Sequence, residues 1–372
     1  MPAPRIPLFK VQLPDGLLPR LSSVFAGGYL NQGDETRLFE QRLGEWVGNP
    51  LVHALSDRSG ALTLALHLAG VRPGDEVIVP PLACLATVMP VANLYARPVW
   101  CDVDPLTGMI EARSLDARIT DRTRAILGVH WGGDVCELEA AADVARRHGL
   151  RFIDDAAEAF GAECRGRRLG SNGADFTAYS FYAVAHLTTG EGGALFATDP
   201  EAHARARWLK RYGIHQPSFR LADGDLNPDS DIVEAGYNFG MINLEAAIGA
   251  LQLEQADAIV ARCRDNGRYF DGALAGVPGL TLLRRRADAV SGYWVYSLLA
   301  ERRDDLKRKL HGHGIGCQRL HLRCDRYTCF GGTTADLPGV ARFDEGNLSI
   351  PCGAWVTDAD REFIADVIRR GW

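Results

Sequence analysis

The sequence predicts a large α/β fold built on a mostly parallel sheet, and three observations support this prediction. The chain has 372 residues, enough for two or three domains or for one large enzyme fold. From about residue 50, strand-like and helix-like segments alternate. Hydrophobic residues make up 47% and charged residues 24%, the balance of a globular protein, which excludes a disordered chain, a collagen and a coiled-coil rod.

Short apolar runs predict the strands, and periodic segments predict the helices between them. The strand-like runs are 75–80, 97–104, 122–130, 150–157, 175–182 and 192–198. The helix-like segments among them are 59–70, 85–96 and 137–149. Strands that alternate with helices of this length imply βαβ units. Because such sheets bind ligands beyond the carboxyl ends of their strands, the loops that follow strands should carry the chemistry.

The pattern changes in the last third of the chain. The segment 243–274 predicts one long helix or two, and the segments 291–300, 304–316 and 358–372 are typical of a smaller α+β domain. We therefore predict a large domain over residues 1–250 and a small C-terminal domain over residues 251–372.

Charge and hydropathy limit the partners and the location. The net charge of −6 argues against a protein that coats nucleic acid. No stretch approaches the roughly 18 uninterrupted apolar residues of a membrane helix. The first residues contain prolines and charges where a signal peptide needs an apolar core. We expect a cytoplasmic protein with no nucleic-acid and no membrane partner.

The chain has many cysteines but few lysines, and both numbers bear on its chemistry. The nine cysteines are scattered without a C-x-x-C pair, so we expect free buried thiols in a reducing compartment and no metal site. Lysine occurs at only four positions, namely Lys10, Lys210, Lys307 and Lys309, which leaves few amines available for chemistry.

Two acidic residues end one of the predicted strands. Asp154 and Asp155 follow an apolar run, where a carboxylate faces the ligand crevice of a parallel sheet. Such a carboxylate could hold a metal, act as a base or pair with a cationic ring nitrogen. This segment alone favours a different interpretation, a helix cap, because aspartate before "AAEA" is a good N-cap.

Three other segments allow both a functional and a structural interpretation. The small residues 188–193 after Ser180 suit a phosphate, or simply a β-hairpin turn. Ser59 stands at a helix N-terminus, a natural anion site next to Arg58, or is a plain cap. The segment 234–257 forms a turn and a helix that packs in the core or at a dimer interface.

Together and in order, these segments resemble the DegT/DnrJ/EryC1/StrS sugar aminotransferases. The resemblance covers nearly the whole chain. Its segments are "GGYLNQGDETRLFEQRLGEWVG", "GDEVIVPPLACLAT", "DVDPLTG", "VHWGG", "DDAAEAFGA", "SFYAVAHLTTGEGGALFAT", "GYNFGMINLEAAIGALQLE" and "LSIPCGAWVTDAD". Members have the fold of the pyridoxal 5′-phosphate (PLP) enzymes of fold type I, a mostly parallel sheet with helices on both faces and a smaller C-terminal domain.

The resemblance implies a reaction and its partners. It implies transfer of an amino group from L-glutamate, through PLP and its pyridoxamine form (PMP), to a nucleotide-linked 4-keto or 3-keto deoxysugar. A cyclitol ketone is a further acceptor that the sequence leaves open. It also implies a homodimer with shared active sites.

The resemblance also assigns roles to residues. Asp155 should pair with the pyridine nitrogen of PLP and keep it protonated, and Glu158 should lie beside the cofactor or the sugar. The residues expected at the cofactor phosphate are Arg58, Ser59, Ser180 and, from the second subunit, Asn238. Cys84 stands where many relatives place an aromatic ring over the cofactor. Arg58 lies in a turn that is commonly serine-glycine-threonine, and the sequence leaves open whether it assists the phosphate or points to solvent. His321 and Arg323 are candidates on the substrate side.

One departure from the family pattern affects the chemistry directly. The family usually reads S-F-x-x-x-K before T-G-E-G-G, but Ala185 occupies the lysine position here. Without that amine the cofactor has no Schiff-base partner, and no lysine moves the proton. We therefore expect the chain as written not to turn over as an aminotransferase.

Three explanations for Ala185 remain open at the level of sequence. The first, which we favour, is a Lys→Ala change in an otherwise intact enzyme. The second is a PMP-dependent sugar 3-dehydratase, because such relatives carry histidine at the lysine position and His186 lies one residue later. The third is a non-catalytic ligand-binding relative that has kept the fold.

Overall fold

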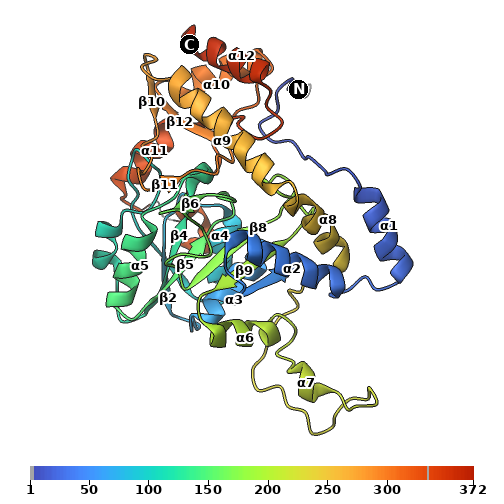
Figure 1. The fold of residues 1–372 in the computed structure, drawn as a ribbon. Coiled ribbons are helices and arrows are strands. Elements are labelled where there is room, and N and C mark those ends of the chain that lie inside the picture. Colours follow the sequence, from blue (N-terminus) through green and yellow to red (C-terminus); the bar gives the residue numbers. More distant parts are fainter. Residues whose placement is uncertain (1–3, 333–334) are drawn as a thin grey trace.

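A seven-stranded sheet forms the centre of the computed structural model, which describes residues 4–332 and 335–372 (Figure 1). The strand order is β1-β9-β8-β5-β4-β2-β3. β9 runs antiparallel to both of its neighbours, and the pairs from β8 to β3 are all parallel. The bounds are β1 (Val52–Leu55), β2 (Glu76–Val79), β3 (Arg97–Trp100), β4 (Thr123–Val129), β5 (Arg151–Asp155), β8 (Phe176–Ser180) and β9 (Gly193–Ala197). The predicted α/β class with a mostly parallel sheet is confirmed.

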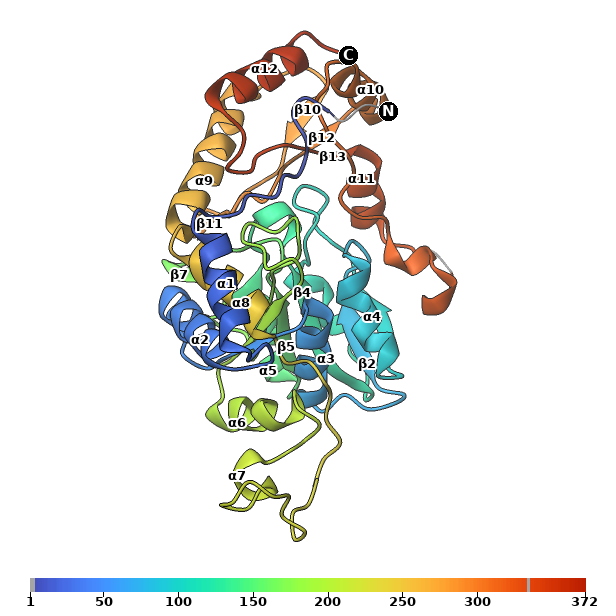
Figure 2. The same ribbon diagram turned by 90° about the vertical axis from the view of Figure 1, so that its right-hand side faces the viewer.

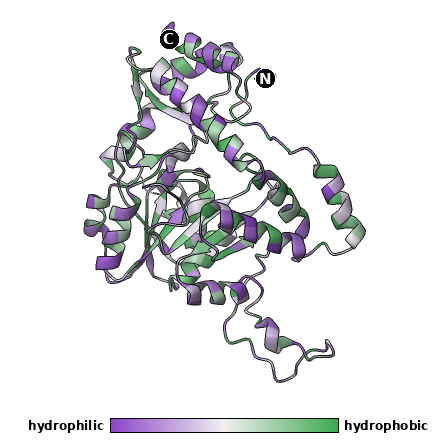
Figure 3. Cartoon of the chain, viewed as in Figure 1, coloured by the Kyte–Doolittle hydropathy of each residue, from purple (hydrophilic) through white to green (hydrophobic). Residues whose placement is uncertain are grey.

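Helices cover both faces of this sheet and give it two apolar layers. Helices α2 (Asp34–Val47), α5 (Leu138–Arg147) and α8 (Asn243–Leu253) share one buried cluster with the sheet. Helices α3 (Arg58–Leu68), α4 (Leu85–Asn93) and α6 (Pro200–Leu209) share the other. Burial on both faces explains the continuous apolar runs of the strands, which are mostly hydrophobic in Figure 3.

A second, smaller sheet forms the C-terminal part of the chain. Strands β10 (Leu280–Leu282), β12 (Tyr296–Ala300) and β13 (Asn347–Ile350) pair in the order β10-β12-β13. They share a buried cluster with α9 (Ala256–Ala273), α10 (Arg303–Gly312) and α12 (Asp358–Arg369). The predicted domain boundary at residue 250 falls within α8 and remains a prediction.

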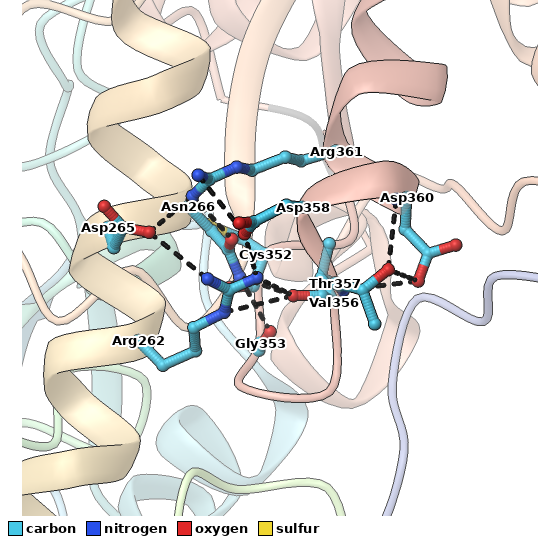
Figure 4. A network of polar contacts seen from close by, with 10 residues as sticks. All are labelled: Arg262, Asp265, Asn266, Cys352, Gly353, Val356, Thr357, Asp358, Asp360 and Arg361. Atoms are coloured by element: carbon cyan, nitrogen blue, oxygen red, sulfur yellow. Dashed lines mark hydrogen bonds and ion pairs between the residues drawn. The ribbon is translucent and has the colours of Figure 1, made fainter.

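A polar network fixes the C-terminal helix α12 on α9 (Figure 4). Thr357 caps α12 by accepting a hydrogen bond from the backbone N–H of Asp360 at 3.1 Å. Arg262 of α9 donates to the carbonyl of Val356 at 2.7 Å and pairs with Asp358 at 2.7 Å. The buried amide of Asn266 donates to the carbonyl of Gly353 at 3.1 Å. These contacts hold the loop before α12 against α9.

The N-terminal segment crosses from the small sheet to the large one. Ile6 pairs with Ile315 and belongs to the buried cluster of the C-terminal part. Phe9 then stacks on Trp294 with ring centroids 4.8 Å apart. Helix α1 (Leu17–Gly27) follows at the edge of the molecule (Figures 1 and 2). The segment therefore passes along the loops at the carboxyl ends of the central strands.

The remaining elements are short. They are α7 (Gln216–Phe219), α11 (Pro338–Gly346), the small sheet of β6 (Glu163–Cys164), β7 (Arg167–Arg168) and β11 (Ala289–Val290), and the 3-10 helices η1 (Ala112–Ser114), η2 (Asp116–Arg118), η3 (Trp131–Gly133), η4 (Cys324–Arg326) and η5 (Thr328–Phe330). The segment 212–237, which contains α7 and lies between the bridged residues Arg211 and Asn238, projects away from the sheet in both views (Figures 1 and 2). We call it the projecting segment. Among the described residues, no helix combines the length and the apolar character needed to cross a membrane.

Candidate active site

A cavity of about 640 Å³ lies beyond the carboxyl ends of the central strands. The segment after β1 contributes Asp57 and Arg58, the segment after β2 contributes Cys84, and the end of β5 is followed by Glu158. The cavity is also lined by Phe9, Ser180, Tyr182, Val184, Ala185, Trp294 and His321. The expectation that the loops after strands share one site agrees with this geometry.

Asp155 lies behind Arg58, which lines the cavity, and is hydrogen-bonded to its neighbours. Its Oδ2 accepts a hydrogen bond from Thr87 Oγ1 at 2.6 Å, and its Oδ1 accepts from the backbone N–H of Ala157 at 3.1 Å. The guanidinium of Arg58 lies 3.8 Å from Oδ2. The chain after β5 forms a turn at residues 157–158 and no helix, so Asp155 does not cap a helix.

Arg58 is a half-buried cation among acidic and thiol groups. Its side chain is 12% exposed. Burial opposes its charge, but the carboxylate of Asp155 and the thiol of Cys84 leave the pKa of Arg58 raised above its ordinary value. The side chain thus stays charged and lies beside Asp155, and its expected contact with a phosphate remains a prediction.

The N-terminus of α3 is capped by Asp57, a residue that the sequence analysis did not single out. Asp57 Oδ1 accepts a hydrogen bond from the backbone N–H of Gly60 at 2.8 Å, and Ser56 Oγ donates to Oδ2 at 2.9 Å. Ser59, whose alternative interpretation was the cap, instead donates to the carbonyl of Ala86 at 3.4 Å. The aspartate two residues before Ser59 was the signal that could have revealed this cap.

The phosphate end of the expected site is rich in carboxylates. Asp57 and Glu191 both line the cavity. Burial, together with the charge of Asp57, raises the pKa of Glu191 above its ordinary value. Ser180 also lines this part of the cavity, and its hydroxyl accepts a hydrogen bond from the backbone N–H of Tyr182 at 3.3 Å.

Glu158 and His321 meet in the cavity wall. The Nε2 atom of His321 is hydrogen-bonded to Glu158 Oε1, and the backbone N–H of Gly132 donates to Glu158 Oε2 at 2.7 Å. Burial opposes the charged form of Glu158, yet His321 and Gly132 hold its pKa below the ordinary value. The structure therefore places both predicted residues in one buried acid–imidazole pair.

Ala185 lines the main cavity as a methyl group, and the cavity has no lysine in its described lining. None of the four lysines, each of which the structure describes, lines the main cavity. Lys210 is buried elsewhere, with its Nζ 3.0 Å from Glu40. Lys10 shares with Ala185 and His186 a separate small cavity next to Trp294.

Two predicted site residues, His186 and Arg323, are absent from the described residues that line the main cavity, and their roles remain predictions. His186 is hydrogen-bonded through Nε2 to the carbonyl of Gly292 at 2.9 Å, and it lines the small cavity that contains Lys10. Arg323 is held by Asp325, with Nη2 2.6 Å from Oδ2, and by the carbonyl of Ala335. A paired guanidinium of this kind positions the loop rather than facing a ligand.

Asn238 lies at the base of the projecting segment. Its Oδ1 accepts a hydrogen bond from Arg211 Nη1 at 2.8 Å. Its expected contact with the phosphate in a second subunit remains a prediction.

Aromatic residues that the sequence analysis did not select complete the wall. Trp294 Nε1 donates to the carbonyl of Val184 at 2.7 Å, which braces the loop that carries Ala185. Phe9 stacks on the same indole. Phe9 and Trp294 are far apart in the chain, so no local motif could have revealed them.

The comparisons with known proteins agree with this geometry. The model of the DegT/DnrJ/EryC1/StrS aminotransferase family matches residues 15–369, and the chain belongs to this family. GDP-perosamine synthase of Caulobacter vibrioides is 35% identical over 341 residues, covering 87% of this chain and 86% of that protein. The crystal structure of the sugar aminotransferase CalS13 from Micromonospora echinospora is 33% identical with a TM-score of 0.94, covering 99% of this chain and 100% of CalS13.

The family consists of PLP-dependent sugar aminotransferases. A more distant neighbour, Spr1654 of Streptococcus pneumoniae, shares the fold at 23% identity and a TM-score of 0.90, covers 98% of both chains, and has been solved in a PMP form and in a PLP form. In this chain the walls of the cavity fit the same cofactor, since a buried carboxylate, two serine hydroxyls and a helix N-terminus surround one space. Asp57 and Arg58 also line this space, and they add one acidic and one basic side chain to it.

Proposed function

We propose that this chain has the site of an aminotransferase for nucleotide-linked keto sugars with L-glutamate as donor, and that Ala185 disables the transfer. The observation that carries this proposal is the cavity itself, which has the acidic and hydroxyl groups of a PLP site but the methyl of Ala185 where an amine is needed. A covalent anchor and a proton carrier are both required for amino transfer, and alanine supplies neither.

The other residues at the cavity would bind the cofactor and the sugar. Asp155 would hold the pyridine nitrogen, while Ser59 and Ser180 would contact the phosphate. When bound, PLP supplies an electron sink for the carbon that gains or loses nitrogen. The pair of Glu158 and His321 offers a hydrogen-bonding wall for a sugar, and Trp294 with Phe9 excludes water from one side.

The substrate class follows from the relatives. The name GDP-perosamine synthase belongs to a protein whose product is an amino sugar linked to a nucleotide, and this relative aligns over most of the chain. A nucleotide-linked 4-keto or 3-keto deoxysugar is therefore the acceptor we propose.

A homodimer is the assembly that we propose. The projecting segment exposes Leu226 at 60% and Val233 at 91%, and α1 exposes Phe25 at 59%. Apolar side chains exposed on two parts of the surface, here α1 and the projecting segment, are typical of surfaces that a second subunit covers. Light scattering should report a dimer for the chain and a monomer for the variant Leu226→Asp with Val233→Asp. A monomeric parent chain would refute this assembly.

The proposed function is tested by restoring the amine. The variant Ala185→Lys, at saturating PLP, should retain one cofactor covalently after borohydride reduction, as measured by intact mass, and should release 2-oxoglutarate from L-glutamate. Ala183→Lys is the matched control, because Ala183 is not among the described residues that line the cavity. The unaltered chain should do neither.

Three outcomes would contradict the proposal. If the unaltered chain retains PLP on Lys10 and releases 2-oxoglutarate, the chain is not disabled. If Ala185→Lys retains PLP but releases no 2-oxoglutarate, the aminotransferase function is wrong and a ligand-binding role replaces it. If it releases 2-oxoglutarate but aminates no nucleotide-linked keto sugar, the acceptor class is wrong.

A further inference from the structure

We propose that Asp57 and Arg58 compete with pyridoxal phosphate for the two charged ends of its site, so that this chain binds the cofactor more weakly than a variant without these charges. The inference rests on the proposed function only in taking this cavity as the cofactor site. It concerns two adjacent residues, one acidic and one basic, at the start of α3.

Arg58 stands at the end of the site where a cationic ring would bind. Its Nη1 lies 3.8 Å from Asp155 Oδ2, the same oxygen that accepts the hydrogen bond of Thr87. Asp155 is 3% exposed, and it is absent from the described residues that line the cavity, whereas Arg58 lines it. A ring nitrogen that approaches Asp155 must therefore displace a guanidinium that already neutralises the carboxylate.

Asp57 stands at the other end, where an anion would bind. The first N–H groups of a helix and its positive dipole end attract phosphate. In this chain the carboxylate of Asp57 already accepts the hydrogen bond of the Gly60 N–H at 2.8 Å. A phosphate dianion would meet this negative charge, and also that of Glu191 in the same wall.

Arg58 has the charge of the ring nitrogen of PLP, and Asp57 has the charge of its phosphate. A PLP molecule offers a cationic ring nitrogen and an anionic phosphate. Arg58 offers a cation to Asp155, and Asp57 offers an anion to the helix end. Since Ala185 removes the covalent anchor, the affinity of this chain for the cofactor depends on these two non-covalent ends alone.

The test separates the two ends with two ligands. PMP has both the ring and the phosphate, whereas pyridoxamine has the ring alone, and neither has an aldehyde that could react with surface lysines. Their binding to the chain, Asp57→Asn, Arg58→Ala and the double variant is measured by titration calorimetry. Asparagine caps helices as well as aspartate does, so Asp57→Asn removes the charge and keeps the cap.

We expect Asp57→Asn to tighten binding of PMP but not of pyridoxamine, and Arg58→Ala to tighten binding of both. The double variant should bind PMP about tenfold more tightly than the chain, which corresponds to about 1.4 kcal/mol. Asp199→Asn, which changes the cap of α6, and Arg113→Ala, an exposed arginine, are the matched controls and should leave both affinities unchanged.

The proposal is overturned if the double variant binds PMP no more tightly than the chain while its melting temperature is unchanged. It is also overturned if Asp57→Asn tightens PMP and pyridoxamine equally, because the effect would then not depend on the phosphate. Neither measurement uses turnover or a lysine at position 185. If the double variant binds PMP more tightly but Ala185→Lys releases no 2-oxoglutarate, the proposed function is refuted and the present proposal stands.

Discussion

His321 and Glu158 form a buried hydrogen bond that joins two segments 163 residues apart in the chain. Their side chains are 15% and 7% exposed, and both residues line the cavity. The pair ties the loop before η4 to the end of β5. It therefore couples the shape of the site to the packing of the C-terminal part of the chain.

The variant Glu158→Gln should lower the free energy of unfolding at neutral pH. A hydrogen bond to a charged group contributes about 1.5–3 kcal/mol, and glutamine keeps the contact with Gly132 but loses the charge. Because the folded-state pKa of Glu158 lies below its ordinary value, this stabilisation is present above that value and is lost as the pH falls below it.

Urea unfolding of the chain and of Glu158→Gln across a pH series checks this prediction. The two free-energy curves should converge at acidic pH. Glu362→Gln, an exposed position on α12, is the control and should follow the parent chain throughout. A constant separation of the curves at all pH values would show that the charge of Glu158 contributes nothing.

Labelling of the thiols should reveal the cavity directly. Cys84 lines the cavity and is half-buried, Cys329 is exposed, and the other seven cysteines are buried. Burial raises the pKa of Cys101 and of Cys263 to about 12, which makes such thiols unreactive at neutral pH. A small thiol reagent should therefore label Cys329 and Cys84 before the others.

Bound PMP should slow the labelling of Cys84 and leave Cys329 unaffected. Peptide mass mapping after timed labelling measures both rates in one sample, so Cys329 serves as the internal control. Equal protection of the two thiols, or none at Cys84 at saturating PMP, would place the ligand outside this cavity.

The variant Lys210→Met should destabilise the chain by about 3 kcal/mol, since it leaves the carboxylate of Glu40 without its buried partner. Lys210 Nζ lies 3.0 Å from Glu40 Oε1. Burial opposes the charge of Glu40, but His53 and Lys210 lower its pKa from 4.5 to about 2. The stabilisation by this carboxylate is thus present above pH 4.5 and lost as the pH falls toward 2.

Chemical denaturation of Lys210→Met, Glu40→Gln and the double variant measures the coupling. The double variant should lose less stability than the sum of the single variants, and the cost of Lys210→Met should shrink in acid. Lys307→Met is the control. Additive losses would mean that the two side chains do not stabilise each other.

The variant His186→Asn distinguishes the dehydratase alternative from the proposed function. His186 contacts Gly292 outside the main cavity, and burial lowers its pKa to about 4. The substitution should therefore leave PMP affinity unchanged and cost about 1 kcal/mol of stability. The dehydratase alternative would be supported if His186→Asn no longer binds PMP. It would also be supported if the parent chain dehydrates a sugar and the variant does not.

The half-buried side chain of His186 also predicts how the stability of the chain changes with pH. Because its folded-state pKa lies below the ordinary 6.5, the unfolded chain binds more protons between about pH 4 and 6.5. Stability at this position rises with pH through that interval, and His186→Asn should flatten the rise. An unchanged slope would assign the titration to another group.

Sequence patterns predicted the elements of the fold because each pattern is local. The run 75–80 contains β2 and the run 150–157 contains β5, since apolar residues between turn signals make buried strands wherever they occur. The segment 243–274 left one helix or two open, and the structure has two, α8 and α9. The positions of Asp155, Glu158, Ser180 and Ala185 around one site followed from the order of strands and from the family motifs.

Side-chain direction could not be predicted in the same way. Ala185 and His186 are neighbours, yet one lines the main cavity and the other contacts Gly292. Arg58 was expected near a phosphate and lies against Asp155, and Asp57 was not expected at all. Each of these outcomes depends on a partner that is distant in sequence or on a loop conformation that no periodicity specifies.

The sequence alone determined the α/β class, the family and the missing amine, because repeating hydrophobicity and residue identity are properties of the chain itself. Only the tertiary structure decided which charges share the cavity. From the sequence, Asp57 has no assigned role and Arg58 either assists a phosphate or points to solvent, but folding brings the ends of β1 and β5 and the start of α3 to the same end of the sheet. There, burial and proximity make Arg58 the partner of Asp155 and Asp57 the anion at the start of α3.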